Sequence, residues 1–262
     1  MKKLETLINS NQKLLIPYIT PDFPFKGVTE KLSHELEKIG IKAIELGIPY
    51  SDPLADGPTI QQSSLVAIAN GVNVKRVLEL ADYISKNTNI AVILMGYTNQ
   101  MLQYGIEKFF SEAKLSGMQG VIVPDMPQDE SNLFRQSAMN NEIALIYLVA
   151  PTSKPERIQL ISERSSLFSY CVSMNGVTGK DGIDFDSLKD IIGRVSQFHS
   201  KPFVIGFGLS TPKDIQFVFK IAKGAVVGSA LIRALEKGKT IDESVKSGIE
   251  FLKPLAEVSV EQ

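Results

Sequence analysis

The stretch IAVILMGYTNQMLQYGIEKFFSEAKLSGMQGVIVPDM, residues 90–126, contains the pattern that decides the fold. It begins with an apolar, partly β-branched run that ends at Gly-Tyr, continues with a segment of helical period, and returns to a second apolar run that ends near a proline. Two strands joined by one helix form a βαβ unit, in which the strands lie parallel. The stretch therefore predicts a parallel sheet with helices between its strands.

The same alternation continues in both directions along the chain. Eight strand candidates result, at 14–20, 43–49, 90–97, 120–126, 143–151, 167–174, 202–208 and 224–230. Segments of helical period lie between them, at 28–40, 74–87, 106–117, 130–141, 155–165, 184–198 and 211–222. Eight parallel units close into a barrel, and no GxGxxG motif follows the first strand, so the pattern favours an α/β fold of the (β/α)8 type, the TIM barrel, over an open doubly wound sheet.

Two further helices are predicted at the chain ends, roughly at 2–9 and around 244–258, as extra elements that cap the barrel. The chain has 262 residues, of which 44% are hydrophobic and 22% charged, a composition typical of a globular protein with a full core. This length fits one barrel, and we expect a single domain over residues 1–262.

The charge balance excludes several classes of partner. The chain has 28 Lys and Arg against 29 Asp and Glu, so it lacks the basic field that attracts nucleic acids and anionic membranes. Its beginning, MKKLETLINSNQKLL, lacks the apolar run of a signal peptide, and no segment approaches the length of a membrane span. The single cysteine, Cys171, cannot form an internal disulfide. We therefore expect a soluble, cytoplasmic protein with no nucleic-acid or membrane partner.

Two carboxylates near the second strand are candidates for acid–base chemistry. Strand alternation places Glu45 on the face that points into the barrel. It is either a hydrogen-bonded structural residue or a general acid/base whose pKa is raised by burial. Asp56 follows eleven positions later within ADGP, where it forms the turn, or caps the helix that begins near Pro58, or completes a carboxylate pair with Glu45.

The last two strands have the features of a phosphate site. Strand 202–208 ends in GFGLSTP, with Gly206 and Gly208 available for close backbone approach and Ser210 or Thr211 ahead of a helix. Strand 224–230 ends at Gly228 and Ser229, which lead directly into another helical segment. Helix starts in these two loops bind phosphate in many (β/α)8 enzymes. The glycines after strand 167–174 fit a mobile lid as readily as a third phosphate contact: Gly176, Gly179 and Gly182.

Missing residue types narrow the chemistry further. The two histidines, His34 and His199, are far apart in the sequence and fall in predicted helices. The sequence therefore offers almost no histidines that could form a zinc site or a catalytic triad. The lysines nearest to strands are Lys13, Lys42, Lys201 and Lys223. All of them lie at or before the N-terminal edge of a strand, so none is placed to form a Schiff base inside the barrel. What remains is carboxylate chemistry on a phosphorylated small molecule.

Six motifs, spread over nearly the whole chain, resemble the tryptophan synthase alpha subunit family: ELGIPYSDPLADGPTIQ, LMGYTN, VPDMP, YCVSMNGVTG, GFGLSTP and VVGSA. The resemblance implies retro-aldol cleavage of indole-3-glycerol phosphate to indole and glyceraldehyde 3-phosphate, a lyase reaction without cofactor or metal. It also implies an α2β2 heterotetramer in which a pyridoxal-phosphate-dependent beta subunit receives the indole for tryptophan synthesis.

The resemblance assigns expected roles to individual residues. Glu45 and Asp56 would be catalytic, with Tyr170 beside the catalytic Glu and Thr178 closing over the site. Phosphate contacts would come from Gly179, Gly208, Gly228 and Ser229. Positions around the indole pocket would be Tyr18, Tyr97 and Asp125.

Three alternatives remain at this point. A free-standing indole-3-glycerol phosphate lyase would have the same barrel and site but no partner. A pentose-phosphate epimerase would need metal-binding His and Asp ligands that this chain lacks. A non-catalytic barrel that only activates a partner would keep the carboxylates for structure, and the intact Glu45 and Asp56 argue against it.

Overall fold

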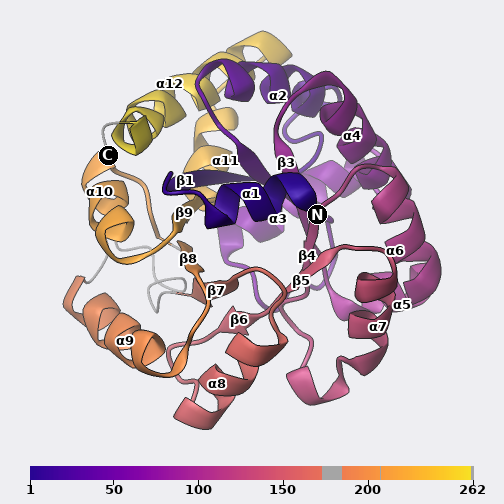
Figure 1. The fold of residues 1–262 in the computed structure, drawn as a ribbon. Coiled ribbons are helices and arrows are strands. Elements are labelled where there is room, and N and C mark those ends of the chain that lie inside the picture. The colour runs from indigo at the N-terminus through magenta and orange to yellow at the C-terminus, as the bar shows by residue number, and fades with distance from the viewer. Residues whose placement is uncertain (173–184, 207, 261–262) are drawn as a thin grey trace.

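The computed structural model describes residues 1–172, 185–206 and 208–260, and it shows a barrel of parallel strands inside a ring of helices (Figure 1). The strands are β1 Leu14–Ile19, β2 Ala43–Gly47, β3 Ala91–Met95, β4 Gly120–Ile122, β5 Ala144–Ile146, β6 Leu148–Val149, β7 Ser169–Val172, β8 Phe203–Gly206 and β9 Gly224–Val227. They form one sheet in the order β5-β4-β3-β2-β1-β9-β8-β7-β6, and the pairs are parallel.

The strands β5 and β6 are two halves of one barrel strand, interrupted only at Tyr147. The first half pairs with β4 and the second half pairs with β7, so together they join the two ends of the sheet. The buried Tyr147 hydroxyl donates a 2.7 Å hydrogen bond to Ser131 outside the sheet. The eight predicted strands are therefore confirmed, and the barrel is of the (β/α)8 type.

The helices are α1 Lys2–Asn9, α2 Val28–Lys38, α3 Pro58–Ala69, α4 Val74–Asn87, α5 Thr98–Tyr104, α6 Ile106–Leu115, α7 Asn132–Asn140, α8 Pro155–Arg164, α9 Phe185–Phe198, α10 Pro212–Ile221, α11 Ser229–Leu235 and α12 Ile241–Val260, with a 3-10 turn η1 at Gln128–Glu130. The seven predicted segments between strands are confirmed. His199 lies just after α9, not inside a helix.

The two terminal helices take different places. Helix α1 crosses the barrel end nearest the viewer in Figure 1, where the fully buried Leu4 donates its amide to the Gln119 side chain at 2.7 Å. Helix α12 instead packs against α2, α10 and α11 in the outer ring. The predicted N-terminal cap is confirmed, whereas the C-terminal helix closes the ring around β1 and does not cap an end.

Helices α3 and α11 pack against each other at the opposite end of the barrel, where the strands end. Each begins directly after a loop that holds site candidates: α3 follows Asp56 and Gly57, and α11 follows Gly228. The fold therefore gathers the candidates at the carboxyl ends of the strands, the end that holds the active site in enzymes of this architecture.

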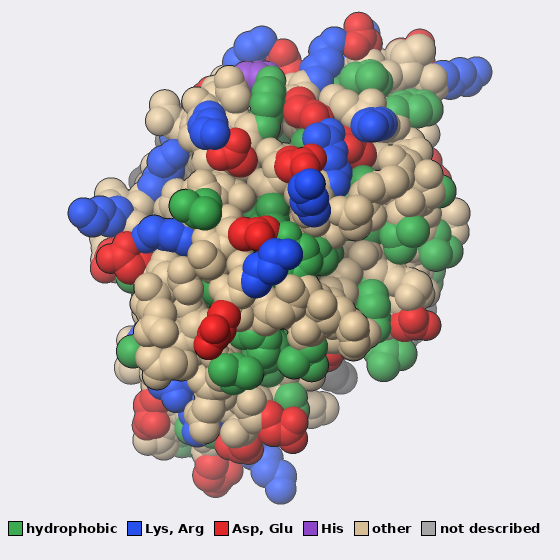
Figure 2. Space-filling model, turned by 90° about the vertical axis from the view of Figure 1, so that its right-hand side faces the viewer, with side chains coloured by type: hydrophobic (Ala, Val, Ile, Leu, Met, Phe, Trp, Pro, Cys, Tyr) green, Lys and Arg blue, Asp and Glu red, His purple; other side chains and the backbone are tan. Residues whose placement is uncertain are grey.

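The outer surface has no dominant charge. Figure 2 shows Lys and Arg intermixed with Asp and Glu across the side of the barrel that lies at the right in Figure 1. This arrangement agrees with the net charge of -1. Among the described residues, the helices include none that combines the length and hydropathy required for a membrane span.

Candidate active site

Glu45 lies in the interior of the barrel on β2. Its register partners are Tyr18 on β1 and Ile93 on β3. The Ile93 side chain faces Gly120 on β4, at 3.5 Å from the position a Cβ would take there, and Leu4 of the capping helix reaches the same point. Residues paired across a parallel sheet share a face, so Glu45 points inward, as the strand alternation predicts.

The Glu45 carboxyl is fully buried, and neither of its oxygens has a hydrogen-bond partner among residues 1–172, 185–206 and 208–260. Burial raises the pKa of this carboxyl to about 8, because the charged form loses its water. A buried polar group without a protein partner is rare and needs a functional reason. The observation argues against a hydrogen-bonded structural role and leaves Glu45 with a proton to give at neutral pH.

Asp56 is bound to Tyr97 at the end of β3. The Tyr97 hydroxyl donates a 2.9 Å hydrogen bond to Oδ2 of Asp56 and accepts the Ala55 amide at 3.0 Å. Burial raises the pKa of Asp56 to about 6, and the Tyr97 hydrogen bond opposes this rise. The N-cap of α3 is Gly57, with no side-chain capping bond. The Asp56 carboxylate therefore binds Tyr97 at the carboxyl end of the barrel and does not cap α3.

Gln100 is a site residue that sequence reasoning missed. Its side-chain oxygen accepts the Tyr97 amide at 3.0 Å, and its amide nitrogen donates to the Pro49 carbonyl at 2.8 Å. It thereby joins the ends of β2 and β3, while the rings of Tyr50 and Tyr97 stack at 5.2 Å. Gln100 binds back to the amide of Tyr97, the N-cap of α5, as in one half of a capping box, but a tyrosine at the N-cap gives no such pattern in the sequence.

Two buried tyrosines occupy space that neighbouring glycines leave open. The Tyr18 hydroxyl lies 2.0 Å from the position of a Cβ on Gly47, and the Tyr170 hydroxyl lies 1.8 Å from that of a Cβ on Gly206. Burial raises the pKa of both phenols, and the charges of Glu45 and Asp56 raise both further. Tyr18 is the register partner of Glu45 and also lies against Gly228, with its Cβ 3.5 Å from the position of a Cβ there, so its ring connects the catalytic and the phosphate candidates.

The candidate phosphate loops lie side by side, because Gly206 on β8 pairs with Val226 on β9. Two residues beyond this pair are Gly208, which has φ of +80° and open space around its missing side chain, and Gly228, which precedes α11. The positive φ favours glycine at position 208.

The Ser210 and Thr211 pair serves another purpose. Both amides donate to Oδ2 of Asp214 at 2.9 Å, and the Thr211 hydroxyl accepts the Asp214 amide in return. This capping box consumes the first donors of α10. The backbone available to a phosphate is therefore around Gly208 and at Gly228 and Ser229.

Asp125 is bound to Thr98. Its Oδ1 accepts both the amide and the hydroxyl of Thr98 at 2.9 Å, at the start of α5. The side chain is exposed, and its bonds explain it as a support for the loop that holds Tyr97. Two other predicted site residues, Thr178 and Gly179, lie outside the described residues.

Comparisons with known proteins agree over nearly the whole chain. A family model described as tryptophan synthase alpha chain matches residues 4–259. The tryptophan synthase alpha chain of Pelodictyon phaeoclathratiforme is 37% identical over 262 residues, covering 97% of this chain and 98% of that protein. The corresponding protein of Petrotoga mobilis is 42% identical over 238 residues, covering 89% and 92%.

Solved structures give the same result. Tryptophan synthase subunit alpha from Legionella pneumophila has a TM-score of 0.90 and 31% identity, covering all of this chain and 98% of that one. A chain of tryptophan synthase from M. tuberculosis in an aminoacrylate-bound form has a TM-score of 0.86 and 28% identity, covering 98% of each chain.

Proposed function

The chain belongs to the tryptophan synthase alpha chain family, and from this premise we propose that Glu45 and Asp56 are the acid–base pair of its reaction. The reaction is the cleavage of indole-3-glycerol phosphate to indole and glyceraldehyde 3-phosphate, and the chain is a carbon–carbon lyase of tryptophan biosynthesis. The observation that carries the proposal is the Glu45 carboxyl, fully buried on the strand next to Tyr18 and without a hydrogen-bond partner in the described part of the chain.

The chemistry needs three things: a proton for indole C3, removal of the proton from the neighbouring glycerol hydroxyl, and stabilisation of positive charge at the indole nitrogen. With a pKa of about 8, Glu45 is protonated at neutral pH and can donate to C3. The resulting carboxylate then accepts the hydroxyl proton. The carbon–carbon bond breaks, its electrons return to the indole ring, and the hydroxyl carbon becomes the aldehyde.

Asp56 supplies the charge stabilisation. With a pKa of about 6 it is mostly ionised at neutral pH, and a carboxylate that accepts one hydrogen bond from Tyr97 keeps lone pairs for the indole N–H. Its negative charge then balances the positive charge that develops on the ring. The pKa values of the two carboxyl groups lie on opposite sides of neutrality, so at pH 7 Glu45 is a proton donor and Asp56 is an anion.

The substitutions Glu45→Gln and Asp56→Asn test this assignment. Glu45→Gln should lower indole release by at least ~10²-fold with the fold intact, because an amide keeps the shape but cannot exchange a proton. Asp56→Asn should impair turnover more than substrate binding. Retention of more than about a tenth of the activity by Glu45→Gln would reject the acid–base role.

We propose that Gly208, Gly228 and Ser229 hold the substrate phosphate, with Thr178 and Gly179 completing the site as the family resemblance implies. Gly228→Asp tests this, because it brings a carboxylate and a Cβ to the place where the backbone would meet the phosphate. Weaker binding of glycerol phosphate is expected. Unchanged affinity would move the phosphate site elsewhere.

The reaction as proposed needs no cofactor or metal, because carboxylates of the chain perform each proton step. The partner is a tryptophan synthase beta subunit, in which pyridoxal phosphate is expected, within an α2β2 heterotetramer of the cytoplasm. The alternative is a free-standing lyase. Indole release measured with and without a beta subunit separates the two, since a high rate without the partner favours the free-standing enzyme.

A further inference from the structure

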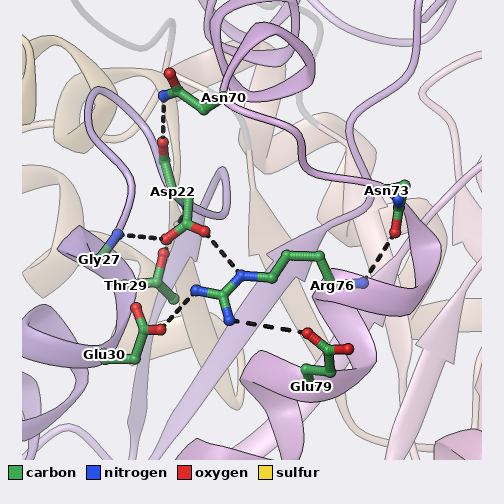
Figure 3. Close-up of polar contacts among 8 residues, drawn as sticks. All are labelled: Asp22, Gly27, Thr29, Glu30, Asn70, Asn73, Arg76 and Glu79. Carbon is green, nitrogen blue, oxygen red and sulfur yellow. Dashed lines mark hydrogen bonds and ion pairs between the residues drawn. The ribbon is translucent and has the colours of Figure 1, made fainter.

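An ionic network with a buried aspartate at its centre holds the turn that follows β1 (Figure 3). Its centre is Asp22, which is 1% exposed and adopts a φ of +52°. The carboxylate accepts the Gly27 amide on one oxygen and Nε of Arg76 on the other, both at 2.9 Å. The Asp22 amide in turn donates to the Thr29 hydroxyl at 2.7 Å. The turn is therefore fixed by its own backbone and by a distant arginine.

Arg76 is the link between this turn and two helices. It stands in the first turn of α4, behind the N-cap Asn73. One Nη donates to Glu30 of α2 at 2.6 Å, and the other lies 4.0 Å from Glu79. The guanidinium is thus shared by three carboxylates, and its removal would leave the buried Asp22 charge without its ion pair.

The turn also holds helix α3 at two points. The Asp22 carbonyl accepts Nδ2 of Asn70, the C-cap of α3, at 2.8 Å, and the same nitrogen reaches the Pro24 carbonyl at 3.2 Å. In the middle of α3, the buried hydroxyls of Ser63 and Thr20 lie 2.7 Å apart. Since the turn contacts α3 at its middle and at its C-cap, a displacement of the turn would displace the helix.

Helix α3 in turn carries Asp56. It begins at Pro58, two residues after Asp56, and Gln61 in its first turn donates to the Asp56 carbonyl at 2.9 Å. The hydrogen-bond partner Tyr97 belongs to a different element, at the end of β3. A shift of α3 would therefore move Asp56 relative to Tyr97.

We propose that Arg76 is a positioning residue for Asp56, acting through Asp22 and helix α3. The proposal rests on the function proposed above, in which Asp56 must be ionised and aligned with the indole N–H. A network that only stabilised the fold would change the melting temperature and leave the titration of Asp56 as it is.

The test is the pH dependence of kcat/KM for indole-3-glycerol phosphate cleavage by Arg76→Met, in the complex with the beta subunit. The acid limb of this profile reports the ionisation of Asp56. It should move to higher pH by about 0.5 to 1 unit, because the loss of one hydrogen bond to the carboxylate raises its pKa by about that amount. Tyr97→Phe removes that bond directly and should give the same shift. The double variant should show no further shift, because each change removes the same contact.

Lys75→Met is the matched control, since it removes one positive charge from an exposed neighbour in the same turn of α4. It should leave the acid limb in place. If Arg76→Met does not fold, Asn70→Ala tests the same connection, because it removes the C-cap contact between α3 and the turn while keeping the ion pair and the contact of Ser63 with Thr20. It should give an upward shift no larger than that of Tyr97→Phe.

The outcomes separate this inference from the proposed function. An acid limb that moves with Tyr97→Phe but not with Arg76→Met or Asn70→Ala would overturn the inference alone. An equal shift in Lys75→Met would also overturn it, in favour of a long-range charge effect. An acid limb that does not respond to Tyr97→Phe would overturn the role of Asp56 and the inference with it.

Discussion

The Tyr170 hydroxyl lies 1.8 Å from the point where a Cβ on Gly206 would stand, so the tyrosine can occupy its place only because residue 206 has no side chain. The two residues belong to neighbouring strands, β7 and β8. Tyr170 is buried, and the charge of Glu45 contributes to the rise of its pKa. A glycine on one strand thereby fixes an aromatic ring near the proposed catalytic carboxyl.

Gly206→Ala should disturb this arrangement. The new methyl group cannot coexist with the Tyr170 ring, so the ring must move, at a cost of about 1–3 kcal/mol in the free energy of unfolding. We expect a lower melting temperature and a fall in indole release of about 10-fold or more. The control is Gly193→Ala, at an exposed helix position with open space, which should be neutral or stabilising. Equal behaviour of the two variants would contradict the steric account.

The pH dependence of kcat/KM should be bell-shaped. Asp56 must be ionised, which sets an acid limb near its pKa of about 6. Glu45 must be protonated, which sets a basic limb near its pKa of about 8. Since kcat/KM reports the groups of the free enzyme, both limbs should be visible in a pH series at low substrate concentration. A rate that keeps rising above pH 9 would show that Glu45 does not act first as an acid.

The strands could be predicted from the sequence because each is a short apolar run closed by Gly or Pro, and such local patterns survive in the fold. The break at Tyr147 could not, because the Tyr147 amide donates to the Ser165 hydroxyl, a side chain that the chain brings close only after folding. Helix α5 was missed for a different reason. It has seven residues and begins directly after the loop that holds Tyr97, so no helical period develops.

The candidate site, too, could be predicted from the sequence only in part. Strand alternation alone points Glu45 inward, but it cannot show that the carboxyl meets no hydrogen-bond partner in the described part of the chain. The bond between Tyr97 and Asp56 spans 41 positions, and no local pattern predicts it. The helix-capping alternative for Asp56 loses support only when the carboxylate is seen on Tyr97, whereas the Asp56 amide does close a turn on the Pro53 carbonyl.

Glu45 should also make stability depend on pH. Its native pKa of about 8 lies above the unfolded value of 4.5, so the native state holds a proton that the unfolded state releases as pH rises between these values. Stability from this group is fully present below pH 4.5 and is lost by about pH 8. Glu45→Gln cannot titrate, so its free energy of unfolding relative to the wild type should rise from pH 5 to pH 8.5, by on the order of 3 kcal/mol.

Urea unfolding of both proteins at the two pH values measures this difference. Glu107→Gln changes an exposed carboxylate on α6 and serves as the control, which should show no such trend. A Glu45→Gln difference that is the same at pH 5 and pH 8.5 would mean that the buried carboxyl is already ionised in the native state at pH 5, and the acid role in the mechanism would lose its basis.

The loop after β2 should couple the partner subunit to the chemistry. Leu54 in this loop is 94% exposed. Large apolar side chains that project from a surface often mark an interaction site. Its neighbour Pro53 is buried, and the Pro53 carbonyl accepts the Asp56 amide at 3.0 Å. A beta subunit docked on Leu54 would therefore act on the turn that holds Asp56.

We expect the partner and a bound glycerol phosphate to favour the same arrangement of this loop, the one in which Asp56 is aligned. The partner then raises turnover, and glycerol phosphate tightens the complex by the same free energy with which the partner tightens glycerol phosphate. We expect the isolated chain to be a monomer with slow indole release. Pro53→Ala should reduce the activation by the beta subunit more than the basal rate, because it loosens the turn that transmits docking to Asp56. Leu115→Ala, at an exposed apolar residue at the end of α6, should change neither rate. Equal losses in the basal and activated rates of Pro53→Ala, or a subunit affinity that glycerol phosphate leaves unchanged, would show that this loop is not the coupling element.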